Sequence, residues 1–222
     1  MDPSSFHALR TGPVDGRNHT VVALGDLRLP SGRLEACDPF VSLGEGLVFP
    51  VPAGSYPAFV TVADVSDAQD GGHLCETHLS VVFAEGTPAR LGLPVPEGGT
   101  PPPAGEHYGI GVDAGTVGFA DASAVAECMP RGADWYEEIF DNGEPDSWFA
   151  LMDSAEHLAA GCANIVLPLA KNGENVVLSH SGWGDGFYPV VATYDADGAL
   201  LGVHIDLLVD DPAYFDPADD EK

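Results

Sequence analysis

The chain is poor in basic residues, because its 222 residues include 8 Lys plus Arg against 35 Asp plus Glu. The resulting formal net charge of -27 repels phosphate backbones and anionic lipid surfaces, so we expect neither nucleic acid nor a membrane among its partners. The same charge suits a basic protein partner, a cation, a surface that mimics DNA or a high-salt cytosol. It also suits solubility alone.

Cysteine is scarce as well. Cys37, Cys75, Cys128 and Cys162 lie far apart and form no CxxC pair, which fits neither a zinc knuckle nor a disulfide scaffold. The stretch 73–78, HLCETH, offers two metal ligands on one strand face, and two ligands are too few for a site. We therefore predict buried free thiols, no metal and no cofactor.

Long apolar runs and catalytic signatures are missing too. Nowhere do about 18 apolar residues follow one another, and the N-terminus lacks a basic segment followed by an apolar one, so we predict a cytoplasmic protein. The GxSxG motif of a nucleophile elbow is also missing. The sequence accordingly predicts no catalytic residues.

Short apolar strands separated by Gly, Pro, Asn and Asp make up most of what is present. The clearest strands are predicted at 20–29, 56–65 and 73–84, and a short helix is predicted at 121–129 with Asp121 as its N-cap. These elements predict an α+β fold dominated by antiparallel β-sheet, either sandwich-like or strongly bent, with one or two short helices.

Two hairpins are predicted from turn residues. Asn172-Gly173 is expected to form a tight turn between strands at 163–170 and 174–180. Asp197-Gly198 predicts three cross-strand pairs: Tyr194 with Leu201, Ala192 with Val203, and Val190 with Ile205. The opposite face of this second hairpin, which carries Asp195, Thr193, His204 and Asp206, is expected to face solvent.

Composition divides the chain into three parts. Residues 1–18 form a polar N-terminal segment, residues 19–209 a single β-rich domain, and residues 210–222 an acidic tail. Within the domain, the Pro/Gly-rich stretch 97–106 is predicted to be an exposed, extended connection.

Two glycine-rich stretches are the best candidates for a binding site: GIGVDAGTVGFAD at 109–121 and SGWGDGFY at 181–188. Glycine lets a backbone approach a ligand, and an indole supplies a flat wall, so we expect both loops to line one concavity. The candidate binding residues are Asp113, Thr116, Asp121, Trp183, Asp185 and Tyr188. In the alternative, Asp113 bonds the backbone of its own turn, and the second loop is only a β-bulge at a sheet corner.

Four ordered segments, LPSGRLEACDPFV, VPAGSYPAFVTVADV, GIGVDAGTVGFAD and SGWGDGFYPVVATYDADG, resemble the bacterial domain-of-unknown-function family numbered 4241. The resemblance extends from about Leu24 to Asp206. It implies a single bacterial intracellular domain, and it implies no activity, cofactor or catalytic residue.

Charge and composition together favour a non-enzymatic binding or interaction protein, such as an immunity-like or regulatory partner of a basic protein. The alternative is a small-molecule enzyme, for example a hydrolase, with a cleft lined by the 109–121 and 181–188 loops. Asp113 and Asp185 would then be its acid and base.

Overall fold

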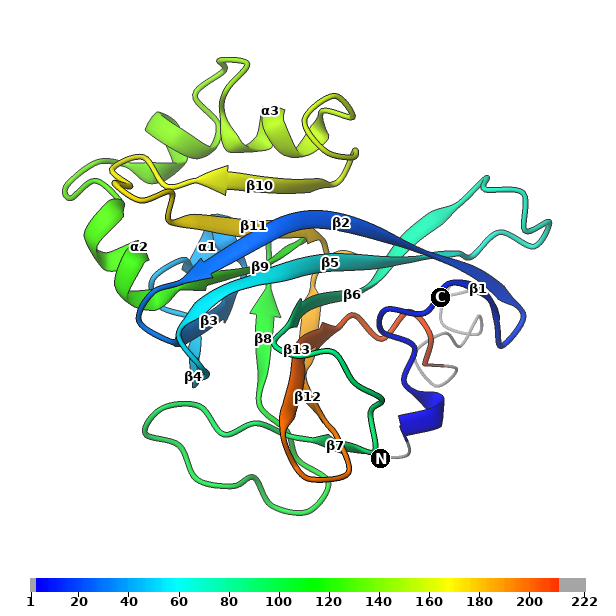
Figure 1. The fold of residues 1–222 in the computed structure, drawn as a ribbon. Helices are drawn as coiled ribbons and strands as arrows, with labels where there is room; N and C mark the ends of the chain where they lie inside the picture. Colours follow the sequence, from blue (N-terminus) through cyan, green and yellow to red (C-terminus); the bar gives the residue numbers. More distant parts are fainter. Residues whose placement is uncertain (1–2, 212–222) are drawn as a thin grey trace.

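The structure, a computed structural model, describes residues 3–211, whose strands form two antiparallel sheets (Figure 1). The order in the larger sheet is β1 (Gly12–Val14), β2 (Arg17–Leu29), β5 (Gly54–Asp64), β6 (Leu74–Val82), β13 (Leu200–Asp206), β12 (Gly186–Tyr194) and β7 (Arg90–Gly92), and β8 (Gly109–Val112) also pairs with β12. The order in the smaller sheet is β10 (Cys162–Val166), β11 (Asn175–His180), β9 (Thr116–Asp121), β3 (Arg33–Cys37) and β4 (Leu47–Pro50). The predicted α+β fold dominated by antiparallel sheet is confirmed.

Short helices complete the fold. They are η1 (Pro3–Ser5), α1 (Pro39–Ser42), α2 (Ala122–Cys128), η2 (Tyr136–Phe140) and α3 (Trp148–Asp153). Asp121 caps α2 as predicted, because its Oδ1 accepts hydrogen bonds from the backbone N–H groups of Ser123 and Ala124, both at 3.0 Å. In Figure 1, α3 lies beside β10 and α2 lies near the ends of β9 and β3, both away from β12 and β13.

The smaller sheet separates two hydrophobic cores. Successive side chains of a strand point to opposite faces. Phe119 and Val177 therefore lie in the core shared with the larger sheet, whereas Ala120 and Leu178 lie in the core formed with the helices. Every residue of β9 is buried, as its apolar sequence indicates for a strand covered on both faces.

Strand β2 connects the two sheets through side-chain hydrogen bonds. Its register shifts between Ala23 and Gly25, where Gly25 has a φ of 83°. The Asn164 side chain of β10 donates to the Leu24 carbonyl at 2.7 Å, and Asn175 of β11 donates to the Asp26 carbonyl at 2.9 Å. These amides therefore anchor the edge of the smaller sheet to the bulged strand.

The turn between β8 and β9 carries the chain from the larger sheet to the smaller one, and the Asp38 carboxylate holds it. Oδ2 accepts from the backbone N–H groups of Asp113 at 3.0 Å and Ala114 at 2.8 Å. Oδ1 accepts from the Thr116 hydroxyl at 2.6 Å and from the Phe40 N–H, which caps α1. The alternative in which Asp113 bonds its own turn is wrong, because a carboxylate 75 positions earlier fills that role.

The predicted hairpin of β10 and β11 is confirmed, but its connection is longer than the predicted turn at Lys171-Asn172-Gly173. The strands stop pairing at Val166 and Asn175, and only Gly173 has a positive φ between them, at 78°. The Glu174 carboxylate accepts from the backbone N–H groups of the two residues before Gly173, at 3.0 and 2.9 Å. The tight turn at Asn172-Gly173 is therefore wrong, because a side chain organises a longer loop.

The hairpin of β12 and β13 follows the prediction in register but not in burial. Two predicted pairs are confirmed, Ala192 with Val203 and Val190 with Ile205, and a bulge pairs Tyr194 with Leu200 instead of Leu201. The predicted solvent-facing side is wrong, because Thr193 and His204 are buried. The N-terminal segment covers this face, where the Phe6 ring contacts the His204 ring with their centroids 5.1 Å apart.

The three parts predicted from composition differ in how much secondary structure they contain. The polar segment 1–18 contains η1 and β1, and β1 pairs with β2. The connection 97–106 has no helix or strand and is largely exposed, whereas residues 212–222 of the predicted tail lie outside the described residues. No helix within residues 3–211 is long and apolar enough to cross a membrane.

We expect Asp38→Asn to lower the free energy of unfolding by about 3 kcal/mol, because an amide nitrogen would replace one carboxylate oxygen that accepts two hydrogen bonds. Urea denaturation at pH 7 measures this loss. Asp67→Asn is the matched control, since the Asp67 side chain is exposed. A loss below about 1 kcal/mol for Asp38→Asn contradicts its role as the clamp of the β8–β9 turn.

Candidate functional site

The two glycine-rich loops are in direct contact. The Ser181 N–H donates to the Gly115 carbonyl at 3.0 Å, and the Gly115 N–H donates to the Asp185 carboxylate at 3.1 Å. Gly182 has a φ of 70°, and a Cβ there would lie 2.6 Å from the carbonyl oxygen of Glu76. Glycine is therefore required at this position for the loop to rest on β6.

Three of the six candidate binding residues lie in the interior. The Thr116 hydroxyl donates to Asp38, and the Tyr188 hydroxyl donates to the Gly184 carbonyl at 2.8 Å. The Asp121 carboxylate accepts from the N–H and hydroxyl of Ser31 in addition to capping α2. These side chains hold the turns in place.

The other three candidates lie nearer to solvent. Asp113 and Asp185 are exposed, and the bond from Gly115 to Asp185 brings the two loops together. Trp183 lines a cleft, where its ring lies edge-on to His73 at a centroid distance of 5.9 Å. The two loops are therefore in contact, but the six candidate residues do not line one concavity. Three are in the interior, two are on the surface, and Trp183 lines the cleft.

That cleft has a volume of about 840 Å³. Its walls are the loop 181–184, the beginning of β6 and the segment that leads into β10. Four of its lining residues carry a carboxyl or imidazole group: His73, Glu76, Asp153 and His180. The cleft has the size of an ordinary small-molecule site, and a few polar groups lie among its mostly apolar walls.

Glu76 and His180 form the polar centre of the cleft on either side of Gly161. A Cβ at Gly161 would lie 2.9 Å from Glu76 Oε1 and 2.8 Å from His180 Nδ1. Burial raises the pKa of Glu76 above its ordinary value, while its own backbone N–H and the nearby His180 lower it. Because glycine has no side chain, the Glu76 carboxyl and the His180 ring can both approach the backbone of Gly161.

The cleft also contains two thiols, which are poor candidates for a nucleophile. Burial raises the pKa of Cys75 to about 11 and that of Cys162 to about 12. Both thiols are therefore protonated at neutral pH, whereas the thiolate is the reactive form. His73 Nε2 lies 3.6 Å from the Cys75 sulfur, so these two residues of HLCETH do come together.

Sequence reasoning did not identify the pair of Glu76 and His180. Glu76 lies within the strand that holds the HLCETH stretch, and His180 directly precedes the second glycine-rich loop. A charged residue inside an apolar strand is a signal of function, but the partner 104 positions later becomes a neighbour only when the two sheets pack.

The fold and the cleft define an α+β protein of two antiparallel sheets with a polar-centred cavity where loops from both sheets meet. The chain belongs to the family described as protein of unknown function (DUF4241), whose model matches residues 27–205. The predicted family is thereby confirmed. No curated protein and no solved structure matches the chain.

We expect Glu76→Gln to raise the free energy of unfolding at pH 7 by about 1 kcal/mol. Because the folded state raises the pKa of Glu76, folding disfavours the ionised carboxylate, and this cost appears as the pH rises through the folded-state pKa. The gain should vanish below about pH 4, where the carboxyl is protonated in both states.

Urea denaturation at pH 4, 5.5 and 7 measures this dependence, with Glu106→Gln on an exposed side chain as the control. A Glu76→Gln variant that is less stable than the parent at pH 7 contradicts the interpretation of Glu76 as a group held at a cost to stability.

Proposed function

We propose that the chain is a non-enzymatic binding protein that accepts a cationic side chain of a basic protein partner in the cleft beside Glu76. The supporting observation is that this carboxylate is withdrawn from solvent without a cationic Lys or Arg partner. Within residues 3–211, the ion pairs of Lys and Arg are Arg17 with Asp210 and Arg33 with Glu97.

A guanidinium or ammonium group is the ligand chemistry that suits this carboxylate. Removing one partner from a buried ion pair leaves an uncompensated charge, so a cation supplied from outside restores favourable electrostatics. Charge-assisted hydrogen bonds from Arg or Lys to a carboxylate are also stronger than neutral ones. Trp183 lines the same cleft and offers an aromatic surface to the aliphatic part of such a side chain.

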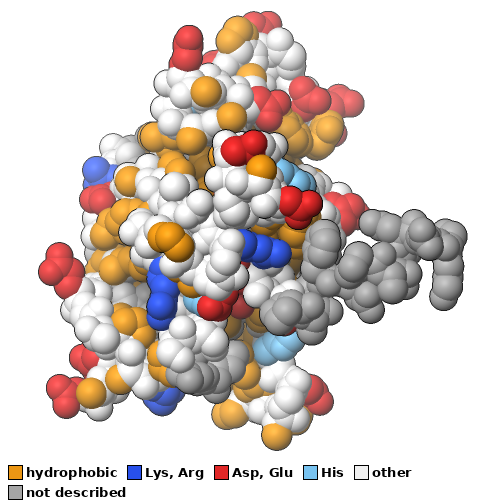
Figure 2. Space-filling model, turned by 90° about the vertical axis from the view of Figure 1, so that its right-hand side faces the viewer, with side chains coloured by type: hydrophobic (Ala, Val, Ile, Leu, Met, Phe, Trp, Pro, Cys, Tyr) orange, Lys and Arg blue, Asp and Glu red, His pale blue; other side chains and the backbone are white. Residues whose placement is uncertain are grey.

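The overall charge supports the same class of partner. A net charge of -27 accelerates association with a basic protein and supplies little specificity by itself. Figure 2 shows acidic side chains spread over one face, with basic and hydrophobic side chains between them. We therefore assign long-range attraction to the whole surface and recognition to the cleft, in an immunity-like or regulatory protein of the bacterial cytoplasm.

A small-molecule enzyme is the second candidate, and the observation that favours it is the closeness of Glu76 and His180 to Gly161. A carboxyl group with a raised pKa beside an imidazole is a suitable pair for proton transfer. In this proposal Glu76 and His180 transfer the proton. Asp185 only holds the two glycine-rich loops together, through its hydrogen bond from the Gly115 N–H.

The experiment for the binding proposal is a calorimetric titration with an Arg- and Lys-rich peptide at several salt concentrations. We expect Glu76→Gln to weaken binding at least about tenfold, equivalent to 1.4 kcal/mol, because it removes the counter-charge in the cleft. Glu106→Gln removes the same formal charge from an exposed position and should change the affinity less than about twofold.

Equal affinities for the Glu76→Gln and Glu106→Gln variants contradict the proposal, because the peptide would then respond only to net charge. A panel of chromogenic esters, phosphates and glycosides distinguishes the enzyme. Turnover that is lost in Glu76→Gln and kept in Glu106→Gln would favour the second candidate.

A further inference from the structure

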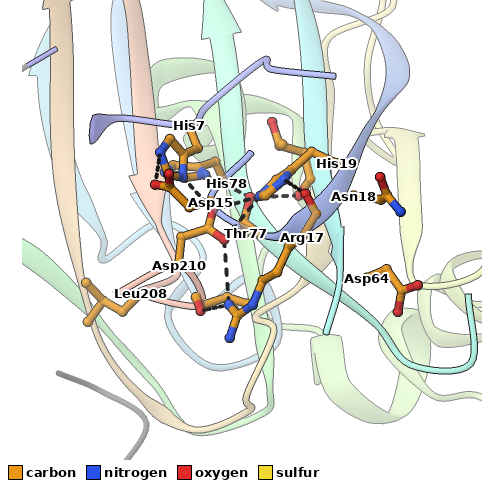
Figure 3. Close-up of polar contacts among 12 residues, drawn as sticks. His7, Asp15, Arg17, Asn18, His19, Asp64, Thr77, His78, Leu208 and Asp210 are labelled. Atoms are coloured by element: carbon orange, nitrogen blue, oxygen red, sulfur yellow. Dashed lines mark hydrogen bonds and ion pairs between the residues drawn. The ribbon is translucent and has the colours of Figure 1, made fainter. Parts of the chain in front are cut away.

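Three potential metal ligands from distant parts of the chain converge at the end of the larger sheet. His7 follows η1, His19 belongs to β2, and Asp210 follows β13 (Figure 3). One ligand atom from each residue lies within 4.8 Å of the others. Both histidines are buried, and the Asp210 side chain is 13% exposed.

The distances among these atoms are close to those of a coordination shell. His19 Nε2 lies 3.1 Å from both carboxylate oxygens of Asp210, and His7 Nδ1 lies 3.6 Å from Asp210 Oδ2. In a tetrahedral zinc site with metal–ligand bonds of about 2.0–2.1 Å, neighbouring ligand atoms are about 3.3 Å apart. The two pairs that include Asp210 are near that spacing, and the widest pair, within 4.8 Å, would have to close by up to about 1.5 Å around an ion.

The outer ring nitrogens are held as metal-binding histidines usually are. His7 Nε2 lies 3.2 Å from the Asp15 carboxylate, and His19 Nδ1 lies 3.3 Å from the Arg17 carbonyl oxygen. A carboxylate or carbonyl that accepts the outer N–H fixes the ring so that its other nitrogen presents a lone pair to the metal. If these outer nitrogens carry the ring protons, His7 Nδ1 and His19 Nε2 present their lone pairs on the side of the Asp210 carboxylate.

An independent observation is an unsatisfied polar atom in the cluster. His7 Nδ1 is buried and has no hydrogen-bond partner within the described residues. Buried polar atoms in proteins are nearly always satisfied, so such an atom requires an explanation. A cation between His7, His19 and Asp210 would satisfy it and would take the place of the hydrogen bond between His19 Nε2 and the Asp210 carboxylate.

We propose that His7, His19 and Asp210 bind a divalent transition-metal ion, and that the ion is zinc. Two imidazoles and one carboxylate are a common zinc ligand set, which leaves a fourth position for water. Asp15 and Asp210 supply two negative charges at the cluster, where Arg17 Nη1 also lies 3.7 Å from Asp210 Oδ1. This proposal is independent of the cleft at Glu76 and replaces the expectation of no metal.

The role that the geometry assigns to the ion is to fasten the N-terminal segment. That segment carries Phe6, whose ring packs against His78 and His204 at centroid distances of 4.8 and 5.1 Å. It also forms one wall of an open cavity of about 760 Å³ beside the end of β6 and the start of β13. Zinc at His7 would therefore hold this cover against the end of the chain at Asp210.

The test is zinc titration of the untagged full chain by calorimetry after dialysis against a chelator. We expect one ion per chain and a rise in Tm of about 5 °C in excess zinc. Cobalt should bind at the same stoichiometry and give a visible absorption band. Asp210→Asn and His7→Gln should each weaken zinc binding at least about tenfold, and Asp15→Asn should do so by about 10–100-fold.

His107→Gln is the matched control, because His107 is an exposed imidazole that contacts the Phe187 ring elsewhere on the molecule, and it should bind zinc as the parent does. Near-ultraviolet circular dichroism checks that each variant is folded, and Asp15→Asn, which changes no ligand, serves if a ligand variant is unfolded. The proposal is overturned if the parent binds no stoichiometric zinc, or if the folded variants bind it as tightly as His107→Gln.

Discussion

The Asp38 carboxylate is the interaction on which the arrangement of the two sheets depends. It accepts hydrogen bonds from the β8–β9 turn and from the start of α1, so one buried side chain fixes the point where the chain leaves the larger sheet and enters the smaller one. Gly115 in this turn then contacts the second glycine-rich loop on both its N–H and its carbonyl. The loop 181–184, which forms one wall of the cleft, is therefore positioned by the β8–β9 turn, and the Asp38 carboxylate holds that turn.

The carboxyl groups of Asp38, Asp121 and Glu76 fall into two groups that differ in their partners. Asp38 and Asp121 accept several hydrogen bonds each, and these bonds offset the cost of removing the charge from water. Glu76 has a desolvated carboxyl beside His180 without a Lys or Arg partner among residues 3–211. The first group stabilises turns and helix ends, whereas Glu76 is a group that a ligand could satisfy.

The buried histidines under the N-terminal segment also differ in their partners. His204 bonds the hydroxyls of Ser80 and Thr193, and burial lowers the pKa of His204 to about 3, so this imidazole is neutral and structural. His7 and His19 instead direct ring nitrogens toward Asp210. The histidines of one region therefore serve different purposes, which only their hydrogen-bond partners distinguish.

The sequence by itself determined the antiparallel α+β fold, the cap of α2 at Asp121 and most of the register of the β12–β13 hairpin, because these depend on local periodicity, capping and turn residues. It also identified the two glycine-rich loops. Tertiary structure decided that Thr116, Asp121 and Tyr188 lie inside, that His204 is buried, and that Glu76 meets His180. Such facts depend on which elements pack together, and a side chain's neighbours across two sheets leave no regular spacing in the sequence that could reveal them.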